Sequence, residues 1–278
     1  FMFIQETTPN DLDDLEKKLR LNQFRGGTAA VYMEPVGPES GTTPITVEYV
    51  KGVERLCRKY GALLVFDEVV TGFRIGMAGA QGYFGVSPDL TIFGKVIAGG
   101  YPGAGGIGGK REYMKYLGAG LDSSGKKIHK ALVGGTMTAN PLSCCAGYFT
   151  LEEIERTNAC QKAGQMGDRI CAGLKELVKK HGLPFVVWNT GSICHLETVG
   201  TMHYQINWKK PWEIPAILGE TGIRQKEMEH MGAAYMAEGL VTLAGSRLYT
   251  SAAYTPKMID QALACFDRVF ENVAVKAD

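Results

Sequence analysis

The chain has 278 residues, of which 45% are hydrophobic, enough apolar side chain for one large domain or two modest ones. Its formal net charge is +1, so no basic field indicates nucleic-acid binding, and no apolar run approaches the ~18 residues of a membrane span. Its seven cysteines include no C-x-x-C pair and its five histidines show no ligand spacing, which argues against a metal site. Free thiols of this kind are typical of a reducing, cytoplasmic compartment.

The N-terminal half predicts alternating strands and helices. Short apolar runs bounded by Gly, Pro or charge are typical of buried parallel strands, and apolar residues at helical spacing mark the helices. Strand, helix and strand in this order predict a parallel sheet with right-handed crossovers, and hence an α/β fold. The elements expected are a strand fragment at 1–5, a helix at 11–21, a strand at 28–33, a helix at 44–60 that Gly61 ends, and strands at 62–66 and 90–93.

Two of these strands lead into residues of complementary chemistry. Asp67 follows the run at 62–66, and Lys95 follows the run at 90–93 after one glycine. Ligands of open α/β sheets bind beyond the carboxyl ends of the strands, so we expect this carboxylate and this amine to enter one crevice. Such a pair suits pyridoxal 5'-phosphate (PLP), which needs a lysine amine for its Schiff base and an acid for its pyridine nitrogen. A structural Asp–Lys ion pair at the sheet edge is the alternative.

A glycine-rich stretch at 99–109 follows the lysine and contains the pattern G-x-G-x-x-G from Gly103 to Gly108. A dinucleotide site would place this pattern directly after a strand and ahead of a long helix, whereas only a short helix is expected here, at 113–117. We expect the glycines to let the backbone pass close to a cofactor, with a nucleotide-binding module as the alternative.

The glycine pair Gly134-Gly135 precedes Thr136 and a helix expected at 141–156. Backbone amides and a hydroxyl at such a turn suit a phosphate, although an ordinary helix cap is the alternative. The rest of the chain predicts a helix at 160–180 that Gly182 closes, strands at 184–188 and 193–198, a loop at 208–215, a helix at 224–238, and a last helix after Thr255-Pro256 whose apolar stripe indicates core packing.

Four stretches, in this order, closely resemble the class III PLP-dependent aminotransferases, and most nearly their glutamate-1-semialdehyde aminomutase-like branch. They are 29–37 (AAVYMEPVG), 64–74 (LVFDEVVTGFR), 93–100 (FGKVIAGG) and 135–142 (GTMTANPL). The resemblance implies the fold of fold-type I PLP-dependent transferases. It assigns 1–150 to part of the large PLP-binding domain, with a mostly parallel sheet, and 151–278 to a small C-terminal α+β domain.

The resemblance also implies roles for individual residues. Lys95 would form the Schiff base and move a proton between the substrate α-carbon and the cofactor C4′. Asp67 would pair with the pyridine nitrogen, and Val69, two residues further on, would pack against one face of the ring. Thr136 would reach the cofactor phosphate of the neighbouring subunit, so a homodimer with its active site at the interface is expected.

Two further residues are candidates for binding the substrate. Glu34 matches a family glutamate near the substrate pocket, with an ion pair to an arginine as the alternative. Arg247 could clamp a substrate carboxylate, because a guanidinium binds carboxylate in a two-pronged way. Surface solvation or a structural ion pair is the alternative for Arg247.

The function that the resemblance implies is transfer of an amino group between an amine or amino acid and an oxo acid. An aminomutase and a non-catalytic fragment are the alternatives, and other PLP reactions on this scaffold stay open. Family members carry an N-terminal part ahead of the position that matches Phe1, with the loop that cups the phosphate and an aromatic residue that stacks on the ring. We therefore expect a missing N-terminal portion or second chain, and poor cofactor binding by the isolated chain.

Overall fold

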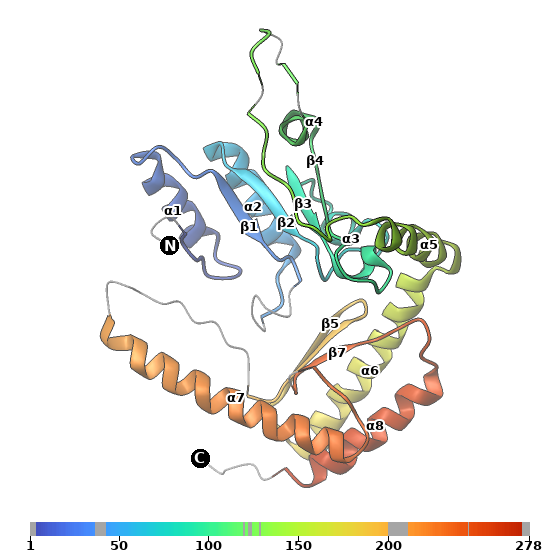
Figure 1. Cartoon of the computed structure of the whole chain (residues 1–278). Helices are drawn as coiled ribbons and strands as arrows, with labels where there is room; N and C mark the ends of the chain where they lie inside the picture. The colour runs from blue at the N-terminus through green and yellow to red at the C-terminus, as the bar shows by residue number, and fades with distance from the viewer. Residues whose placement is uncertain are drawn as a thin grey trace. The chain divides into compact units, whose positions relative to one another are not determined.

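The computed structural model describes two compact units (Figure 1). The residues described are 4–36, 43–118, 120–121, 124–127, 129–199, 211–243 and 245–273. The first unit comprises 10–35 and 45–157, and the second comprises 158–273 together with 4–9, 36 and 43–44. Within the described residues, no helix combines the length and the apolar character that a bilayer crossing requires.

The first unit is built on a four-stranded sheet of order β1-β2-β3-β4 (Figure 1). Strands β1 (Ala30–Met33), β2 (Leu63–Asp67) and β3 (Leu90–Phe93) are parallel, and β4 (Gly106–Gly109) runs antiparallel to β3. The predicted α/β fold with a mostly parallel sheet is therefore confirmed. Parallel pairing also brings the carboxyl ends of β1, β2 and β3 to one edge of the sheet.

Helices of this unit follow the sequence signals for capping. The helix α2 begins after Thr46, whose hydroxyl accepts a hydrogen bond from the Tyr49 amide (3.1 Å), and ends at Gly61 in the left-handed region (φ 70°). It packs against β2, and α1 packs against α2. The helical segments are α1 (Leu12–Gln23), α2 (Val47–Tyr60), α3 (Gly79–Phe84), η1 (Lys95–Ala98), α4 (Arg111–Met114), η2 (Lys115–Leu117) and α5 (Pro141–Thr157).

A buried carboxylate joins three strands at the edge opposite the one where Asp67 lies. Asp89, which is 5% exposed and precedes β3, accepts hydrogen bonds from the Leu64 amide (2.8 Å) in β2 and from the Lys110 amine, just after β4. Burial alone would raise the pKa of Asp89. The hydrogen bonds from Lys110 and Leu64 and the nearby Arg58 charge outweigh burial and hold that pKa below its ordinary value.

Close backbone contact joins the turn that carries Lys95 to α5. A Cβ added at Gly147 in α5 would overlap the carbonyl oxygen of Ile97, and one added at Gly99 would overlap the backbone of Ala146. Gly99 also has a left-handed backbone (φ 58°). The glycines therefore let the backbone of η1 lie directly against α5.

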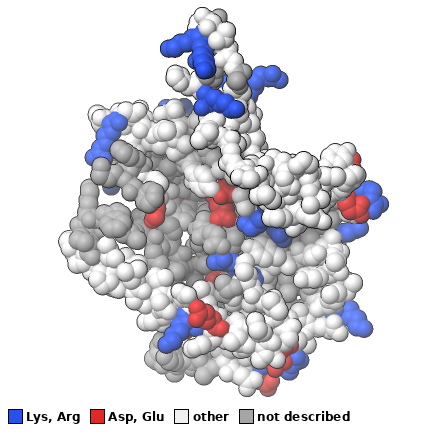
Figure 2. Space-filling model, in the orientation of Figure 1, with Lys and Arg blue, Asp and Glu red and all other residues white. Residues whose placement is uncertain are grey.

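One projecting segment of this unit is cationic. Lys and Arg side chains gather on the part of the chain that extends beyond α4, whereas both signs mix elsewhere on the same face (Figure 2). The near-neutral net charge therefore includes one local cationic segment. The exposed basic residues in this part of the sequence are Arg111, Lys115, Lys126, Lys127 and Lys130.

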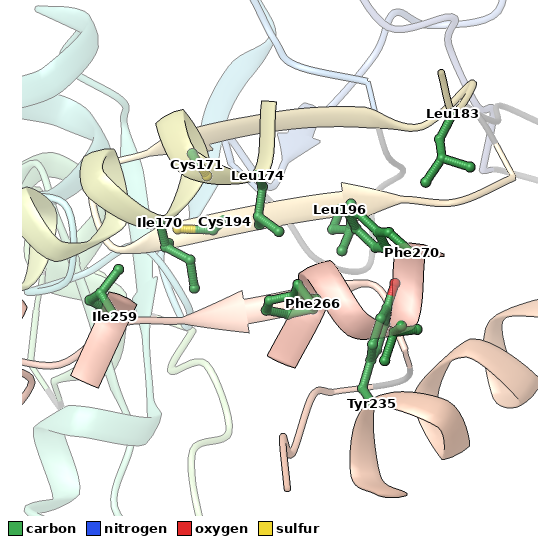
Figure 3. Close-up of a cluster of buried hydrophobic side chains, with 11 residues drawn as sticks. Ile170, Cys171, Leu174, Leu183, Cys194, Leu196, Tyr235, Ile259, Phe266 and Phe270 are labelled. Carbon is green, nitrogen blue, oxygen red and sulfur yellow. The ribbon is translucent and has the colours of Figure 1, made fainter. Parts of the chain in front are cut away.

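The second unit is an antiparallel sheet of order β5-β6-β7 packed with helices, the predicted α+β arrangement. Its core lies between α6, α8, α7 and one face of the sheet (Figure 3). The apolar stripe of α8 is part of this core, as the sequence predicted. The elements are α6 (Ala159–His181), β5 (Val186–Thr190), β6 (Ile193–Glu197), η3 (Pro211–Glu213), α7 (Ile214–Ala237), β7 (Arg247–Tyr249) and α8 (Pro256–Glu271).

Two predicted elements are wrong. Ile4 and Gln5 are not in a strand, and the rest of the fragment expected at 1–5 lies outside the described residues. The loop expected at 208–215 is helical at its end, because α7 begins at Ile214 with Pro215 in its first turn; residues 208–210 lie outside the described residues. Proline is well tolerated there since the first helical amides have no partner in the helix. The elements α3 and β7 were not predicted.

The nucleotide-binding alternative is also wrong. Within the pattern from Gly103 to Gly108, Gly106 already belongs to β4, which returns antiparallel to β3. A dinucleotide motif needs a strand that leads through the glycines into a helix. Here the glycines follow the helical turn η1 and lead into a strand, β4. The end of this glycine-rich stretch instead forms the strand β4.

We expect Lys110→Met to lower the free energy of unfolding at neutral pH by roughly 1–3 kcal/mol, because it leaves the buried Asp89 carboxylate without its charged donor. A carboxyl whose folded pKa is depressed adds stability above its unfolded pKa of about 3.9, and this stability is lost as the pH falls through the folded pKa. Denaturant titrations between neutral and acidic pH should therefore show the variant and the parent converging in acid. A pH-independent difference would contradict the assignment.

We expect Gly147→Ala to lower the free energy of unfolding by about 1–3 kcal/mol, because the added methyl meets backbone that cannot move aside. The matched control is Gly219→Ala in α7, where a Cβ would have nothing within 4 Å. That change should be neutral or stabilising, since alanine is the better helix former. Equal effects of the two substitutions in denaturant unfolding would show that η1 does not lie on α5.

Candidate active site

Asp67 and Lys95 lie at the ends of adjacent parallel strands. Asp67 is the last residue of β2, and Lys95 opens the η1 turn one residue beyond β3. In the sheet register Asp67 pairs with Ile92 of β3, and Lys95 follows Ile92 by three residues. The structure thus places the carboxylate and the amine at one edge of the sheet, as the two apolar runs predicted.

The backbone of Lys95 is unusual. Its φ of 51° lies in the left-handed region, which side chains other than glycine seldom adopt. The side chain is exposed and forms no hydrogen bond or ion pair with another described residue. Strained backbone of this kind is concentrated at functional sites, where the surrounding structure holds it in place. The amine is therefore presented by a strained turn and remains open to a ligand.

The Asp67 carboxylate is held at both oxygens. Oδ1 accepts a hydrogen bond from the Val69 amide (2.9 Å), and Oδ2 accepts one from the hydroxyl of Tyr32 in β1. The pKa of Tyr32 is raised to about 12 by partial burial, by the hydrogen bond to Asp67 and by the charges of Asp67 and Glu34, which all act in the same direction. The phenol is therefore a proton donor over the whole physiological range.

A second acid fixes the loop that follows Asp67. Glu68 is 1% exposed, and its carboxylate accepts hydrogen bonds from the Thr71 hydroxyl (2.9 Å) and the Ala80 amide (2.8 Å). Gly79 has a left-handed backbone (φ 55°), and a Cβ there would overlap this carboxylate. The loop thus folds around the Glu68 carboxylate. Because successive side chains alternate between the two faces, Asp67 points to the opposite face from Glu68.

Val69 connects the acid to the lysine turn. Its methyl groups would lie 3.3 Å from a Cβ added at Gly94, the residue directly before Lys95. The side chain is partly buried, so part of it remains available to a ligand. The structure therefore brings Asp67, Val69 and Lys95 together within the first unit.

Glu34 and Thr136 also belong to this unit. Glu34 directly follows β1 and is half-buried, at the sheet edge where β2 ends. Thr136 is exposed in the turn before α5, and this turn is tied to the chain beyond the lysine. The tie is made by Ser143 and Asn140, whose side chains donate to the Pro102 carbonyl oxygen (2.6 and 3.2 Å).

Arg247 lies in the second unit, half-buried in β7 and paired in register with His195 of β6. The same sheet face is polar: the His195 ring stacks on Trp188 with centroids 4.1 Å apart, and its Nδ1 lies 3.0 Å from the Glu197 carboxylate. His195 and Glu197 are each 1% exposed. Arg247 is thus built into a structured polar face of that unit.

Tyr32 and Glu68 were not predicted as site residues from the sequence. Tyr32 stands two residues before Glu34, so strand alternation places both on one face of the sheet, and this spacing was the available signal. Glu68 carried no comparable signal, because its partners Ala80 and Gln81 follow a loop whose course the residues did not predict.

The arrangement of the first unit suits one class of ligand. An open amine reacts with an electrophilic carbonyl, and a carboxylate with restrained oxygens holds a protonated ring nitrogen. The apolar surface of Val69 lies between them, against the residue before the lysine. A flat, basic heteroaromatic aldehyde therefore has a partner for each of its functional groups here.

Comparison with known proteins agrees with this geometry. Residues 5–244 match the family model for class-III aminotransferases. The chain is 41% identical over 184 residues to glutamate-1-semialdehyde 2,1-aminomutase 1 of Staphylococcus epidermidis, covering 66% of this chain and 40% of the relative. It is 34% identical over 260 residues to glutamate-1-semialdehyde 2,1-aminomutase 2 of Brevibacillus brevis, covering 91% of this chain and 54% of the relative.

Solved structures share the fold. An omega-transaminase from Sphaerobacter thermophilus aligns with a TM-score of 0.74 at 24% identity, covering 95% of this chain and 56% of that one. A transaminase with PLP bound aligns with a TM-score of 0.76 at 22% identity, with the same coverage. The chain spans about half the length of the relatives it matches. By the extent of the family match and the fold, the chain belongs to the class-III aminotransferase family.

Proposed function

We propose that the protein containing this chain is a PLP-dependent aminotransferase that moves an amino group between an amine or amino acid and an oxo acid. One observation carries the proposal: an exposed lysine that pairs with no other described residue and a restrained aspartate stand at adjacent strand ends in a chain of the class-III aminotransferase family. PLP, when bound, supplies the electron sink for chemistry at the substrate α-carbon.

The residues of the first unit fit this cofactor. The Lys95 amine would hold the cofactor aldehyde, and the Asp67 carboxylate would face the pyridine nitrogen. Val69 would cover one ring face, where its methyl groups lie against Gly94. Thr136 would reach the phosphate of a neighbouring subunit, so a homodimer with shared sites is part of the proposal.

The chain's own groups then act on protons and charge. Lys95, once its amine is free, would take the proton from the substrate α-carbon and deliver it to C4′ of the cofactor, as a general base and then a general acid. Asp67 would keep the ring nitrogen protonated by its negative charge. Glu34 and Arg247 are proposed as substrate contacts, with Arg247 suited to a carboxylate.

An aminomutase is the second candidate, because the two relatives described above are both named glutamate-1-semialdehyde 2,1-aminomutase. The two candidates differ in one product. An aminotransferase releases an oxo product from its amino donor in the first half-reaction, an oxo acid from an amino acid and an aldehyde or ketone from an amine, whereas an aminomutase returns the amino group to the same carbon skeleton. Assay of oxo product release against a panel of amino donors separates them. A non-catalytic fragment would show neither reaction.

We expect borohydride reduction of the full-length protein with PLP to leave the reduced cofactor on the peptide that contains Lys95. Lys95→Ala should abolish this attachment, because the amine is the group that bonds to the aldehyde. Lys51→Ala, at an exposed position of α2, is the control and should leave attachment unchanged. Peptide mass mapping reads out the result, and reduced cofactor on another lysine would refute the assignment of Lys95.

We expect Lys95→Gly to be more stable than Lys95→Ala by up to about 1 kcal/mol. The left-handed backbone penalises any Cβ by roughly 1–2 kcal/mol, and the greater freedom of glycine in the unfolded chain offsets part of this gain. Denaturant unfolding of both variants in the absence of cofactor measures the difference. An alanine variant as stable as the glycine variant, or more so, would show that the lysine turn is not strained.

A further inference from the structure

Tyr32 is a residue of the candidate active site to which no role has been assigned. It lies in β1, the strand next to β2, and its hydroxyl donates a hydrogen bond to Oδ2 of Asp67. The side chain is 58% exposed, so the phenol is not placed there by burial in the core. The contact with the carboxylate is instead the specific interaction that fixes its direction.

Strand register produces this contact. Tyr32 pairs with Val65, and Val65 shares a sheet face with Asp67 because side chains alternate along a strand. Glu34 lies on the same face of β1 as Tyr32 for the same reason. A tyrosine is long enough to reach from the level of Val65 to the carboxyl end of β2, where Asp67 lies. A slip of one residue between β1 and β2 would turn the phenol to the other face.

The Asp67 carboxylate therefore has one donor on each oxygen before any ligand arrives, the Val69 amide on Oδ1 and Tyr32 on Oδ2. An ionised carboxylate offers about four acceptor sites, so a ring N–H can still be accepted. Donors to the charged form stabilise its negative charge and weaken its attraction for a further proton. The phenol therefore sets the direction of the Asp67 carboxylate and disperses part of its negative charge.

We propose that Tyr32 is a positioning residue that locks the Asp67 carboxylate in place and reduces how strongly this carboxylate holds the proton on a basic ring nitrogen. The part that concerns the ring nitrogen rests on the proposed function. The hydrogen bond between Tyr32 and Asp67 does not depend on a cofactor, because both residues belong to this chain. Asp67 and Glu34 are the charged groups that act on the phenol, and both disfavour its ionisation.

The contact is tested first in the protein without cofactor, with tyrosines carrying a ¹³C label at Cζ. Tyr32→Phe identifies the Tyr32 signal among the 12 tyrosines. Tyr32 should remain protonated just above pH 10, the ordinary tyrosine pKa of about 10, and Asp67→Asn should bring its ionisation closer to that value. A Tyr32 signal that Asp67→Asn leaves unchanged would overturn the proposal, because the hydrogen bond would then be absent.

The effect on the ring nitrogen is tested in the full-length protein loaded with PLP, through the pH dependence of the visible absorbance. Tyr32→Phe should shift the ring-nitrogen titration to higher pH by about one unit or less, the effect of one hydrogen bond to a charged group. Tyr83→Phe, at an exposed tyrosine of α3, is the control and should not shift it. An unshifted titration in Tyr32→Phe would mean that the phenol leaves Asp67 when the cofactor binds, and the proposal would fail.

The two experiments separate this proposal from the proposed function. If Tyr32 responds to Asp67→Asn but the full-length protein binds no PLP, the proposed function is wrong, and the ring-nitrogen part of the proposal is wrong with it. The positioning of Asp67 by Tyr32 then stands on the first result. If PLP binds at Lys95, but Asp67→Asn leaves the Tyr32 ionisation unchanged and Tyr32→Phe leaves the ring-nitrogen titration unchanged, the proposed function stands and Tyr32 has no positioning role.

Discussion

The parallel pairing of β2 with β3 is the constraint on which the candidate site depends. Asp67 and Lys95 are far apart in the sequence, and their chemistry can be combined only if two strands end at the same edge in the right register. Asp89 supports that register from the other edge, since its buried carboxylate binds the Leu64 amide of β2 and the Lys110 amine beyond β4. A carboxylate outside the site thus helps to align the acid with the amine.

The orientation of each site residue is then set by neighbours that need never touch a ligand. Glu68 gathers the loop after β2 around its carboxylate, and Gly147 lets the lysine turn lie on α5. Phe93, the last residue of β3, packs its ring near that of Phe73, with centroids 6.0 Å apart. Phe73 has a left-handed backbone, as Lys95 does, so both strained residues lie next to the end of β3.

The sequence predicted the parts of this site that depend on local pattern. Short apolar runs that end on Asp67 and before Lys95 are enough to predict strand ends, and strand ends predict where ligands bind. Tyr32 could not be assigned in the same way, because its contact with Asp67 depends on the register of β1 and β2, which the residues of one strand do not specify. The start of α7 was mispredicted for a different reason: the helix was expected only from residue 224, and Pro215, which is compatible with a loop and with a first helical turn, was predicted to lie in a loop.

The side chain and the backbone of Lys95 differ in what holds them in place. The Lys95 side chain is exposed and forms no hydrogen bond or ion pair with another described residue, so its amine can be removed without loss of such an interaction. Its backbone, in contrast, is held in an unfavourable conformation by Gly94 against Val69 and by Gly99 against α5. A residue with an open side chain and a constrained backbone is poorly explained by stability alone, since glycine would adopt the same φ at lower energy. The presence of lysine at this position is therefore better explained by the chemistry of its amine.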